Sequence, residues 1–307
     1  MKVCLAFCRD YASPVLDPVV HHLLRDILDS PVSGCRVLIK PNFISRQNSS
    51  LSCTHPAVIR AVCTFFLQTG NTIVIGDSPA FGTAQYVASS LNLKAYLQES
   101  PVTLTSLTKG QPRPLPFGGT MLLAHEALQA DLIVNIPKLK AHKQMRISGA
   151  VKNLFGCVIG LRKAMMHARY GDKDNRFEQA LLSIGRHLPQ TLTLVDGIRT
   201  MHRTGPIHGQ PYDLNLLAAG MSPGAVDTAL YTLLGLTPEQ VPLWRESCRQ
   251  GLPGTKTSEI HFSGLKPEAF WPNRFQIPDA LAPVSFHPLQ LVKSIIKRVI
   301  SSKKETP

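Results

Sequence analysis

Strand-like and helix-like segments alternate along the first half of the chain, and this alternation limits the fold more than any other feature of the sequence. Short apolar runs at residues 2–8, 35–42 and 71–79 are each followed by a segment with apolar residues at helical spacing. Strands that alternate with helices form parallel sheets whose two faces are covered by helices. The sequence therefore predicts an α/β fold, Rossmann-like, with a mostly parallel sheet flanked by helices.

Polar residues close the predicted strands. Four strands end in such residues, at positions 40–42, 76–79, 137–140 and 196–197. In open α/β sheets, ligands bind in the crevice beyond the carboxyl ends of the strands. We therefore expect the ligand site at this edge of the sheet.

A lysine-rich segment, PKLKAHKQMRISGAVKNLFG (137–156), directly follows one of these strands. A run of charge is ordinarily a solvated face, and that interpretation stands beside a functional one. Pro137, Leu139 and Ile147 interrupt the charges and indicate an ordered loop, and the small residues after it permit close backbone approach. Lys152 lies in an apolar stretch, where an ammonium group needs a partner or a shifted pKa. The segment therefore predicts a loop that binds an anion.

Two histidines flank Lys152 in the sequence. Lys163 and His167 are four residues apart, so both would lie on one face of a helix over 161–167. With His142, the segment could present two imidazoles and an ammonium group to a common pocket, a set that transfers protons near neutral pH. A lone histidine is more often structural, and that alternative stays open.

These patterns give a list of candidate residues. We expect catalytic roles for Lys152, His142 and His167. The expected substrate-binding residues are Lys40, Asn42, Asp77, Ser78, Lys138, Lys140, Asn153, Lys163 and Asp196. The lysines would neutralise an anion, and Asp77 or Asp196 would orient a hydroxyl group or a metal ion. Both aspartates also lie in ordinary turn sequences.

Composition narrows the function classes. The formal charge of +13 invites nucleic-acid binding, but no zinc finger, RNA-binding aromatic signature or DNA-reading motif accompanies it, so we do not expect nucleic acid as a partner. The seven cysteines form no iron–sulfur motif, and we expect no disulfide framework. No apolar run reaches the roughly 20 residues that span a bilayer, and the start does not resemble a signal peptide, so we expect a cytoplasmic protein.

Two parts are expected along the chain: an α/β domain over 1–236 and a C-terminal extension over 237–307. The extension contains a proline-rich strap near 264–286 and a basic amphipathic helix, HPLQLVKSIIKRVISSKK. Such a helix ordinarily docks on the body of a protein with its basic face in solvent. Attachment to an anionic membrane surface is the alternative.

Several motifs resemble the family called domain of unknown function 362. They are VLIKPN, THPAVIRAV, GDSP, ADLIVNIPKLKAH, SGAVKNLFG with the following Lys163 and His167, VDGI…GPIHG and AAGMSPGAVDTALYTLLG, and together they cover about residues 1–236. Many members of that family also carry a ferredoxin-like module with iron–sulfur cysteines, which this sequence lacks.

SGAVKNLFGCVIGLRKAMMH is also similar, more weakly, to a segment of nickel-pincer lactate racemases. Ala150 and Phe155-Gly156 stand where that family has a second glycine and a Pro-Gly turn. The resemblance implies an architecture in which Lys152 lies at the cofactor or substrate position with His167 nearby.

We expect an enzyme that binds a small anionic metabolite, a carboxylate or a phosphate, with acid–base chemistry of the isomerase or racemase type. The sequence does not decide whether the site also binds a metal ion. The alternative is that this chain has no catalytic activity and is an accessory or redox partner protein for iron–sulfur or metal proteins. In that case it would lack a cluster of its own.

Overall fold

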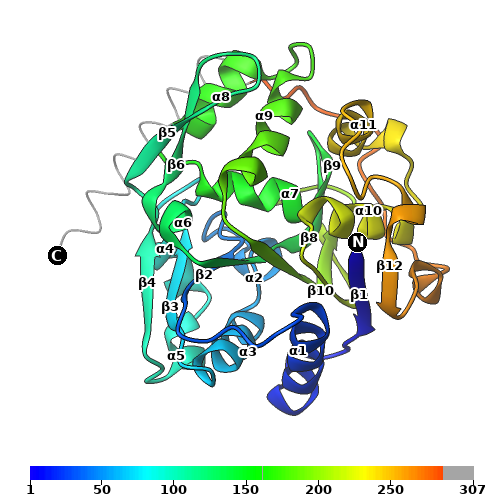
Figure 1. Cartoon of the computed structure of the whole chain (residues 1–307). Helices are drawn as coiled ribbons and strands as arrows, with labels where there is room; N and C mark the ends of the chain where they lie inside the picture. Colours follow the sequence, from blue (N-terminus) through cyan, green and yellow to red (C-terminus); the bar gives the residue numbers. More distant parts are fainter. Residues whose placement is uncertain (161, 286–307) are drawn as a thin grey trace.

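The computed structural model describes residues 1–160 and 162–285 of the chain (Figure 1). The strands are β1 (Lys2–Phe7), β2 (Arg36–Pro41), β3 (Thr72–Asp77), β4 (Val102–Ser106), β5 (Gly110–Pro114), β6 (Thr120–Ala124), β7 (Leu132–Ile136), β8 (Lys138–His142), β9 (Arg146–Ser148), β10 (Thr191–His202), β11 (Gln210–Gly220) and β12 (His261–Gly264). The α-helices are α1 (Ser13–Ile27), α2 (Ser49–Ser52), α3 (Pro56–Leu67), α4 (Ala84–Ser90), α5 (Leu93–Leu97), α6 (His125–Gln129), α7 (Ala150–Asn153), α8 (Arg162–Tyr170), α9 (Arg176–Ile184), α10 (Pro223–Leu233) and α11 (Pro242–Arg249). Short 3-10 helices are η1 (Leu154–Cys157), η2 (Gly185–His187), η3 (Pro238–Gln240), η4 (Thr257–Glu259) and η5 (Pro267–Phe270).

A ten-stranded sheet has the strand order β12-β1-β11-β10-β7-β2-β3-β4, and β8 pairs with β10 and β9 beside this path. Strands β10, β7, β2, β3 and β4 run parallel to one another, whereas β11 is antiparallel to both β1 and β10. Strands β5 and β6 form a small separate sheet. The structure thus confirms the predicted α/β fold with a large, mostly parallel sheet.

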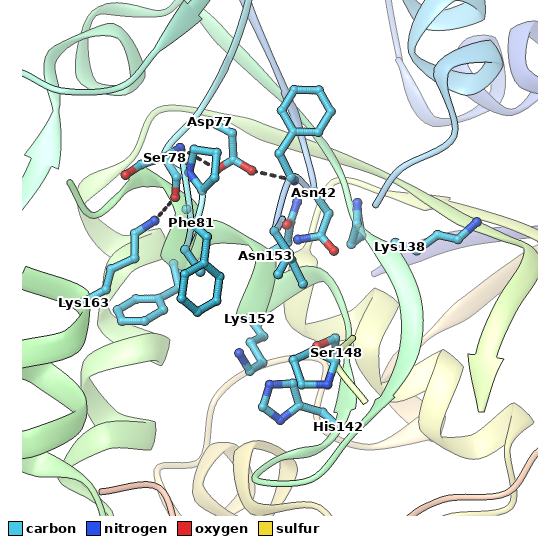
Figure 2. Close-up of a pocket in the computed structure, with 18 of the residues that line it drawn as sticks. Asn42, Asp77, Ser78, Phe81, Lys138, His142, Ser148, Lys152, Asn153 and Lys163 are labelled. Atoms are coloured by element: carbon cyan, nitrogen blue, oxygen red, sulfur yellow. Dashed lines mark hydrogen bonds between the residues drawn. The ribbon is translucent and has the colours of Figure 1, made fainter. Parts of the chain in front are cut away.

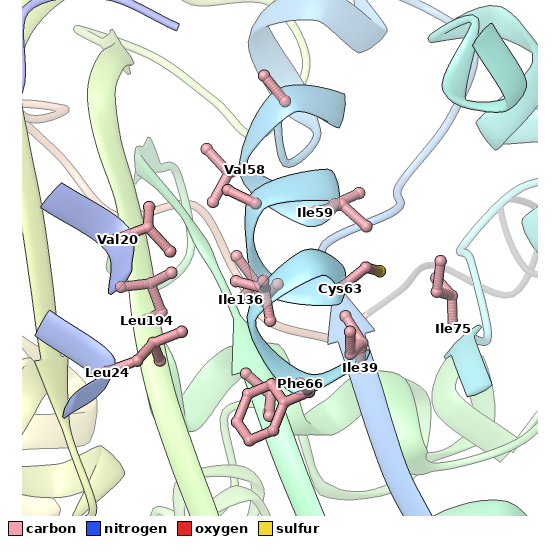
Figure 3. Packing of buried hydrophobic residues seen from close by; sticks show 14 of the residues in the cluster. Val20, Leu24, Ile39, Val58, Ile59, Cys63, Phe66, Ile75, Ile136 and Leu194 are labelled. Carbon is pink, nitrogen blue, oxygen red and sulfur yellow. The ribbon is translucent and has the colours of Figure 1, made fainter. Parts of the chain in front are cut away.

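Helices cover both faces of this sheet (Figure 1), and the side chains of β2 show how. Val37 and Ile39 point to the face that packs on α1 and α3, in the cluster drawn in Figure 3. Leu38, between them, belongs to the opposite cluster, which includes residues of α6 and α9. Because both faces are buried, the central residues 37–39 of β2 are all apolar and do not alternate with polar residues.

The first part of the lysine-rich segment is a buried strand, where the sequence predicted a loop. Pro137 separates it from β7, and the residues that follow form β8, which pairs with β10 and β9. Lys138, Lys140 and His142 share one face because side chains alternate along a strand, and all three are buried. Leu139 faces the opposite side and joins the cluster around β11 and α10. The charges of Lys138 and Lys140 therefore belong to the interior, whereas Lys143, in the turn after β8, is exposed.

Helix α3 lies within the segment that begins with the motif THPAVIRAV, and its N-cap is His55. The His55 side chain accepts a hydrogen bond from the backbone of the first turn. Thr54 connects two strand ends: its Oγ1 accepts from the backbone N of Asn42 at 2.7 Å and donates to the carbonyl of Ile136 at 2.6 Å. This buried hydroxyl ties the end of β2 to the end of β7.

Part of the predicted C-terminal extension completes the main sheet, because β12 pairs in parallel with β1. The proline-rich segment after it runs along the β8–β9 turn and α8, where the backbone N of Ala282 donates to the carbonyl of Lys143 at 2.8 Å. The basic helix predicted in residues 287–304 lies outside the described residues. Within residues 1–160 and 162–285, no helix combines the length and the apolar character needed to cross a bilayer.

Replacing Thr54→Val should destabilise the fold by about 2 kcal/mol, because it leaves a buried backbone donor and a buried acceptor unpaired. Urea unfolding followed by circular dichroism measures this difference. Thr72→Val, at an exposed position of β3, is the matched control and should change stability by less than about 0.5 kcal/mol. Equal stability of both variants would show that Thr54 does not hold the strand ends together.

Candidate active site

A cavity of about 340 Å³ lies at the carboxyl ends of β2 and β3, bounded also by β8, α7 and α8 (Figure 2). Most of the residues predicted for the site line it. They are Lys40, Asn42, Asp77, Ser78, Lys138, His142, Lys152, Asn153, Lys163 and His167. The other two predicted residues, Lys140 and Asp196, lie outside its lining. The volume suits a small metabolite.

The ammonium group of Lys40 is neutralised within the protein. Its Nζ lies 2.8 Å from the Oδ1 of Asp77, and both side chains are buried. The same carboxylate accepts hydrogen bonds from the backbone N of Phe43 and of Ser78, each at 2.8 Å. Gly156 lies against this pair, and a Cβ atom there would overlap with both charged groups. Lys40 and Asp77 therefore form a wall of the cavity that adds no net charge.

Lys138 and Asp196 form a second buried ion pair, with 2.9 Å between Nζ and Oδ2. Asp196 also accepts hydrogen bonds from the hydroxyl of Tyr11 at 2.8 Å and from the backbone N of His55 at 2.9 Å. Figure 2 shows the side chain of Lys138 directed away from the other labelled residues of the cavity. Lys138 thus lines the cavity, while its charge faces Asp196.

Lys140 is the central basic residue of β8. Its Nζ donates to the amide oxygen of Asn42 and to the carbonyl of Ser52. Burial lowers the pKa of Lys140 to about 7. The contacts hold the loop after β2 against β8, so Lys140 positions Asn42 and does not reach the cavity.

Helix α7 carries Lys152 and Asn153 and is fixed from behind by Asp227 on α10. The Asp227 carboxylate accepts hydrogen bonds from the backbone N of Ala150 at 2.6 Å and of Val151 at 3.0 Å. A Cβ atom at Gly149 would overlap with this carboxylate. The glycine therefore permits the close approach that seats the helix.

Lys152 presents its amine to the cavity, in the same hollow as the ring of His142 (Figure 2). Among the described residues, no carboxylate, carbonyl or hydroxyl lies within hydrogen-bond distance of its Nζ. Burial lowers the pKa of Lys152 to about 8. The cavity thus holds an ammonium group whose charge the described residues do not neutralise.

The two histidines of the cavity are fixed in opposite tautomers. Nδ1 of His142 accepts a hydrogen bond from the backbone N of Gln144 at 3.1 Å, so its proton lies on Nε2. Nδ1 of His167 lies 3.0 Å from the carbonyl of Val284, which can only accept, so His167 carries its proton on Nδ1. Burial, and then the charge of Lys152, lower the pKa of His167 to about 3 and that of His142 well below its usual value. Both rings are neutral at pH 7.

Two residues that line the cavity carry buried polar atoms without partners. Among the described residues, the Oγ of Ser78 and the Oδ1 of Asn153 have no hydrogen-bond partner. The Nδ2 of Asn153 donates to Asn135 at 2.8 Å, which fixes the direction of its amide. Lys163 donates to the backbone carbonyl of Ser78 from the opposite wall, as the dashed line in Figure 2 shows.

The sequence analysis missed Asp227 and the aromatic walls formed by Phe81 and Phe155. Asp227 had a signal: it is the acidic residue in the otherwise apolar helix PGAVDTALYTLLG, and a buried carboxylate needs partners. The phenylalanines had none, because apolar residues in loops and helices are ordinary core residues.

The described residues do not fit a metal centre. In the part of the chain that the structure describes, no three His, Cys, Asp or Glu side chains converge as ligands. Besides the Lys40–Asp77 ion pair, the polar side chains that line the cavity carry amines, imidazoles, hydroxyls and amides.

Comparisons with known proteins agree with the motifs. The family model DUF362, described as a domain of unknown function, matches residues 37–232. The thylakoid-associated protein sll1697 of Synechocystis sp. is 33% identical over 266 residues, which cover 86% of this chain and 83% of that protein. Among solved structures, the lactate racemase apoprotein of Thermoanaerobacterium thermosaccharolyticum matches 71% of this chain with 15% identity and a TM-score of 0.43. The match spans 54% of the racemase chain, about half of its length.

Asp77→Asn should lower the free energy of unfolding by about 3–5 kcal/mol, because it leaves the buried charge of Lys40 unpaired. Urea unfolding measures the loss, and the double variant Lys40→Met/Asp77→Asn should lose less than Asp77→Asn alone. Asp213→Asn is the control, since its ion pair with Arg199 is exposed and should contribute less than about 1 kcal/mol. A double variant less stable than Asp77→Asn would contradict the pairing.

Proposed function

The chain belongs to the DUF362 family, a domain of unknown function, and we propose that its cavity binds a small anionic metabolite, a carboxylate or a phosphate, and moves a proton on it. The observation that carries the proposal is Lys152, whose ammonium group faces the cavity with no counter-ion among the described residues. An uncompensated cation in a poorly hydrated site costs free energy, which an anionic ligand would offset.

The other lysines support the choice of Lys152 as the binding charge. Lys40 lies 2.8 Å from one buried carboxylate and Lys138 lies 2.9 Å from another. Both ammonium charges are therefore already neutralised and are not available to a ligand. Lys163, on α8, brings a second ammonium group to the opposite wall. The unpartnered hydroxyl of Ser78 can donate to an oxygen of the ligand.

The tautomers of the histidines support a proton-transfer reaction. In the neutral form deduced above, Nε2 of His167 bears the lone pair that can accept a proton from carbon. Nε2 of His142 bears a proton and can donate a hydrogen bond to an oxygen on which negative charge develops. A negative ligand would raise the pKa of both rings and make His167 a stronger base. Abstraction of a proton next to a carboxylate or carbonyl is the first step of isomerases and racemases, and we assign the cavity to that class.

Binding of the ligand should require Lys152 and should weaken above pH 8. Lys152→Ala should lose more than about 30-fold in affinity, because the charge partner of the ligand in the cavity disappears. Since the pKa of Lys152 is lowered to about 8, the amine loses its charge as the pH rises through that value, and affinity should then fall about tenfold per pH unit.

A thermal-shift screen of carboxylates and phosphates identifies a binder, and calorimetry from pH 6.5 to 9.5 measures its affinity. Lys143→Ala is the control, because Lys143 is an exposed neighbour of His142. A ligand that stabilises wild type and Lys152→Ala equally, or whose affinity does not fall above pH 8, would remove Lys152 from the site.

The name of the thylakoid-associated relative supports a second proposal: the basic segment KSIIKRVISSKK attaches this chain to an anionic membrane surface. The full chain should sediment with phosphatidylglycerol vesicles at low salt and remain in solution with phosphatidylcholine vesicles. The charge reversals Lys293→Glu, Lys297→Glu and Arg298→Glu together should abolish sedimentation, whereas Lys143→Glu should not. Sedimentation that survives the triple reversal would refute the proposal.

A further inference from the structure

Resting on the proposed function, we infer that Lys152 reacts covalently with its substrate, its amine condensing with the carbonyl group of a small 2-oxo carboxylate to form an imine. The inference assigns to the cavity a substrate class that holds both a carboxylate and an adjacent carbonyl carbon.

The contacts of the cavity lysines single out Lys152 as the nucleophile. An amine attacks a carbonyl through a lone pair, and an ammonium group held in an ion pair has none. Lys40 and Lys138 are held by Asp77 and Asp196, and Lys163 donates to the carbonyl of Ser78. Among the described lysines that line the cavity, only Lys152 has no such bond.

Burial also gives Lys152 the neutral form that the reaction needs. With a pKa of about 8, roughly a tenth of its amines are neutral at pH 7, whereas a lysine in water reaches that fraction only above pH 9. Lysines desolvated in this way are the ones that form Schiff bases with carbonyl substrates. The amine also sits on a helix seated by Asp227 and Gly149, so its direction into the cavity is fixed.

The reaction balances with the groups present. The Nζ lone pair bonds to the carbonyl carbon, the carbon–oxygen π electrons move to oxygen, and the oxygen leaves as water after taking up the two amine protons. His142 can donate a hydrogen bond from Nε2 to this oxygen as its charge develops. The imine then takes one proton from solvent, and the resulting iminium draws electrons from the neighbouring C–H bond. His167 accepts that proton at Nε2, the electron pair moves to nitrogen as an enamine, and the reverse steps release the carbonyl product and the free amine.

Borohydride trapping tests the imine. The full chain is incubated with glyoxylate, pyruvate or 2-oxoglutarate and sodium cyanoborohydride at pH 7, and peptide mapping locates the reduced adduct. At least one probe should label Lys152 about 100-fold faster than the exposed lysines, in proportion to its larger neutral fraction. With the probe at saturating concentration, so that weaker binding above pH 8 does not limit the reaction, the labelling rate of the wild-type protein should rise with pH and level off above pH 8, as the neutral amine becomes the main form.

Variants separate the nucleophile from its surroundings. Lys152→Arg keeps the charge but cannot form an imine, so the adduct should vanish, whereas Lys143→Arg, at an exposed lysine outside the cavity lining, should retain it. His167→Gln should retain the adduct and lose at least tenfold in the hydrogen–deuterium exchange of the pyruvate methyl group, followed by NMR. The thermal unfolding of each variant shows whether it folds. If Lys152→Arg does not fold, the labelling rates of the lysines in the wild-type protein test the imine.

The outcomes distinguish the two proposals. Stabilisation by lactate or phosphate, with no preferential adduct at Lys152 from any of the three probes, overturns the imine and leaves the anion site standing. Absence of both stabilisation and adduct overturns both. Labelling of Lys152 at the same rate as the exposed lysines counts against the imine.

Discussion

Two buried ion pairs hold the strand ends from which the cavity is built. Lys40 on β2 meets Asp77 on β3, and Lys138 on β8 meets Asp196 on β10. Each carboxylate also accepts a backbone N–H from the loop after a neighbouring element, Asp77 from Phe43 and Asp196 from His55. Buried pairs are costly to desolvate and add little net stability, but removing one partner is severe. The pairs therefore enforce the alignment of the strands. Four strands and two loops must take their native positions before the charges of both pairs are neutralised.

The same arrangement leaves Lys152 without a counter-ion. A third buried carboxylate, Asp227, lies behind α7, yet it binds the backbone of that helix and not the ammonium group at the end of its side chain. Burial raises the pKa of Asp227 to about 7, consistent with a carboxylate that no cation neutralises. Two carboxylates therefore neutralise Lys40 and Lys138, the third seats the helix, and the positive charge of Lys152 is left facing the hollow.

The sequence predicted the alternation of strands and helices and the location of the cavity at the strand ends because both depend on local patterns, such as the apolar run of β2 and the helical spacing of the apolar residues of α3. It did not predict how the charges pair. Lys40 and Asp77 are 37 residues apart, and Lys138 and Asp196 are 58 residues apart, so their meeting depends on strand order. Because these lysine partners are distant in the sequence, we expected Asp77 and Asp196 to orient a ligand. Polar and apolar residues alternate over Lys138-Leu139-Lys140-Ala141-His142, which is a strand pattern. Buried lysines in such a strand cannot be distinguished from the lysines of a solvated loop unless their partners are known.

The motif SGAVKNLFG has a physical explanation in this geometry. Its first glycine, Gly149, lies against Asp227, and its second, Gly156, lies against the Lys40–Asp77 pair; a Cβ atom at either position would overlap with a charged group. The helical turn between them is thus pressed from two sides by carboxylates, and Asn153 ties it to Asn135 on β7. A larger residue at either glycine would push α7 away from the charged groups that it packs against. The side chain of Lys152 would then lose its fixed direction into the cavity. The two glycines keep the amine of Lys152 in one place, between an imidazole that can accept a proton and one that can donate a hydrogen bond.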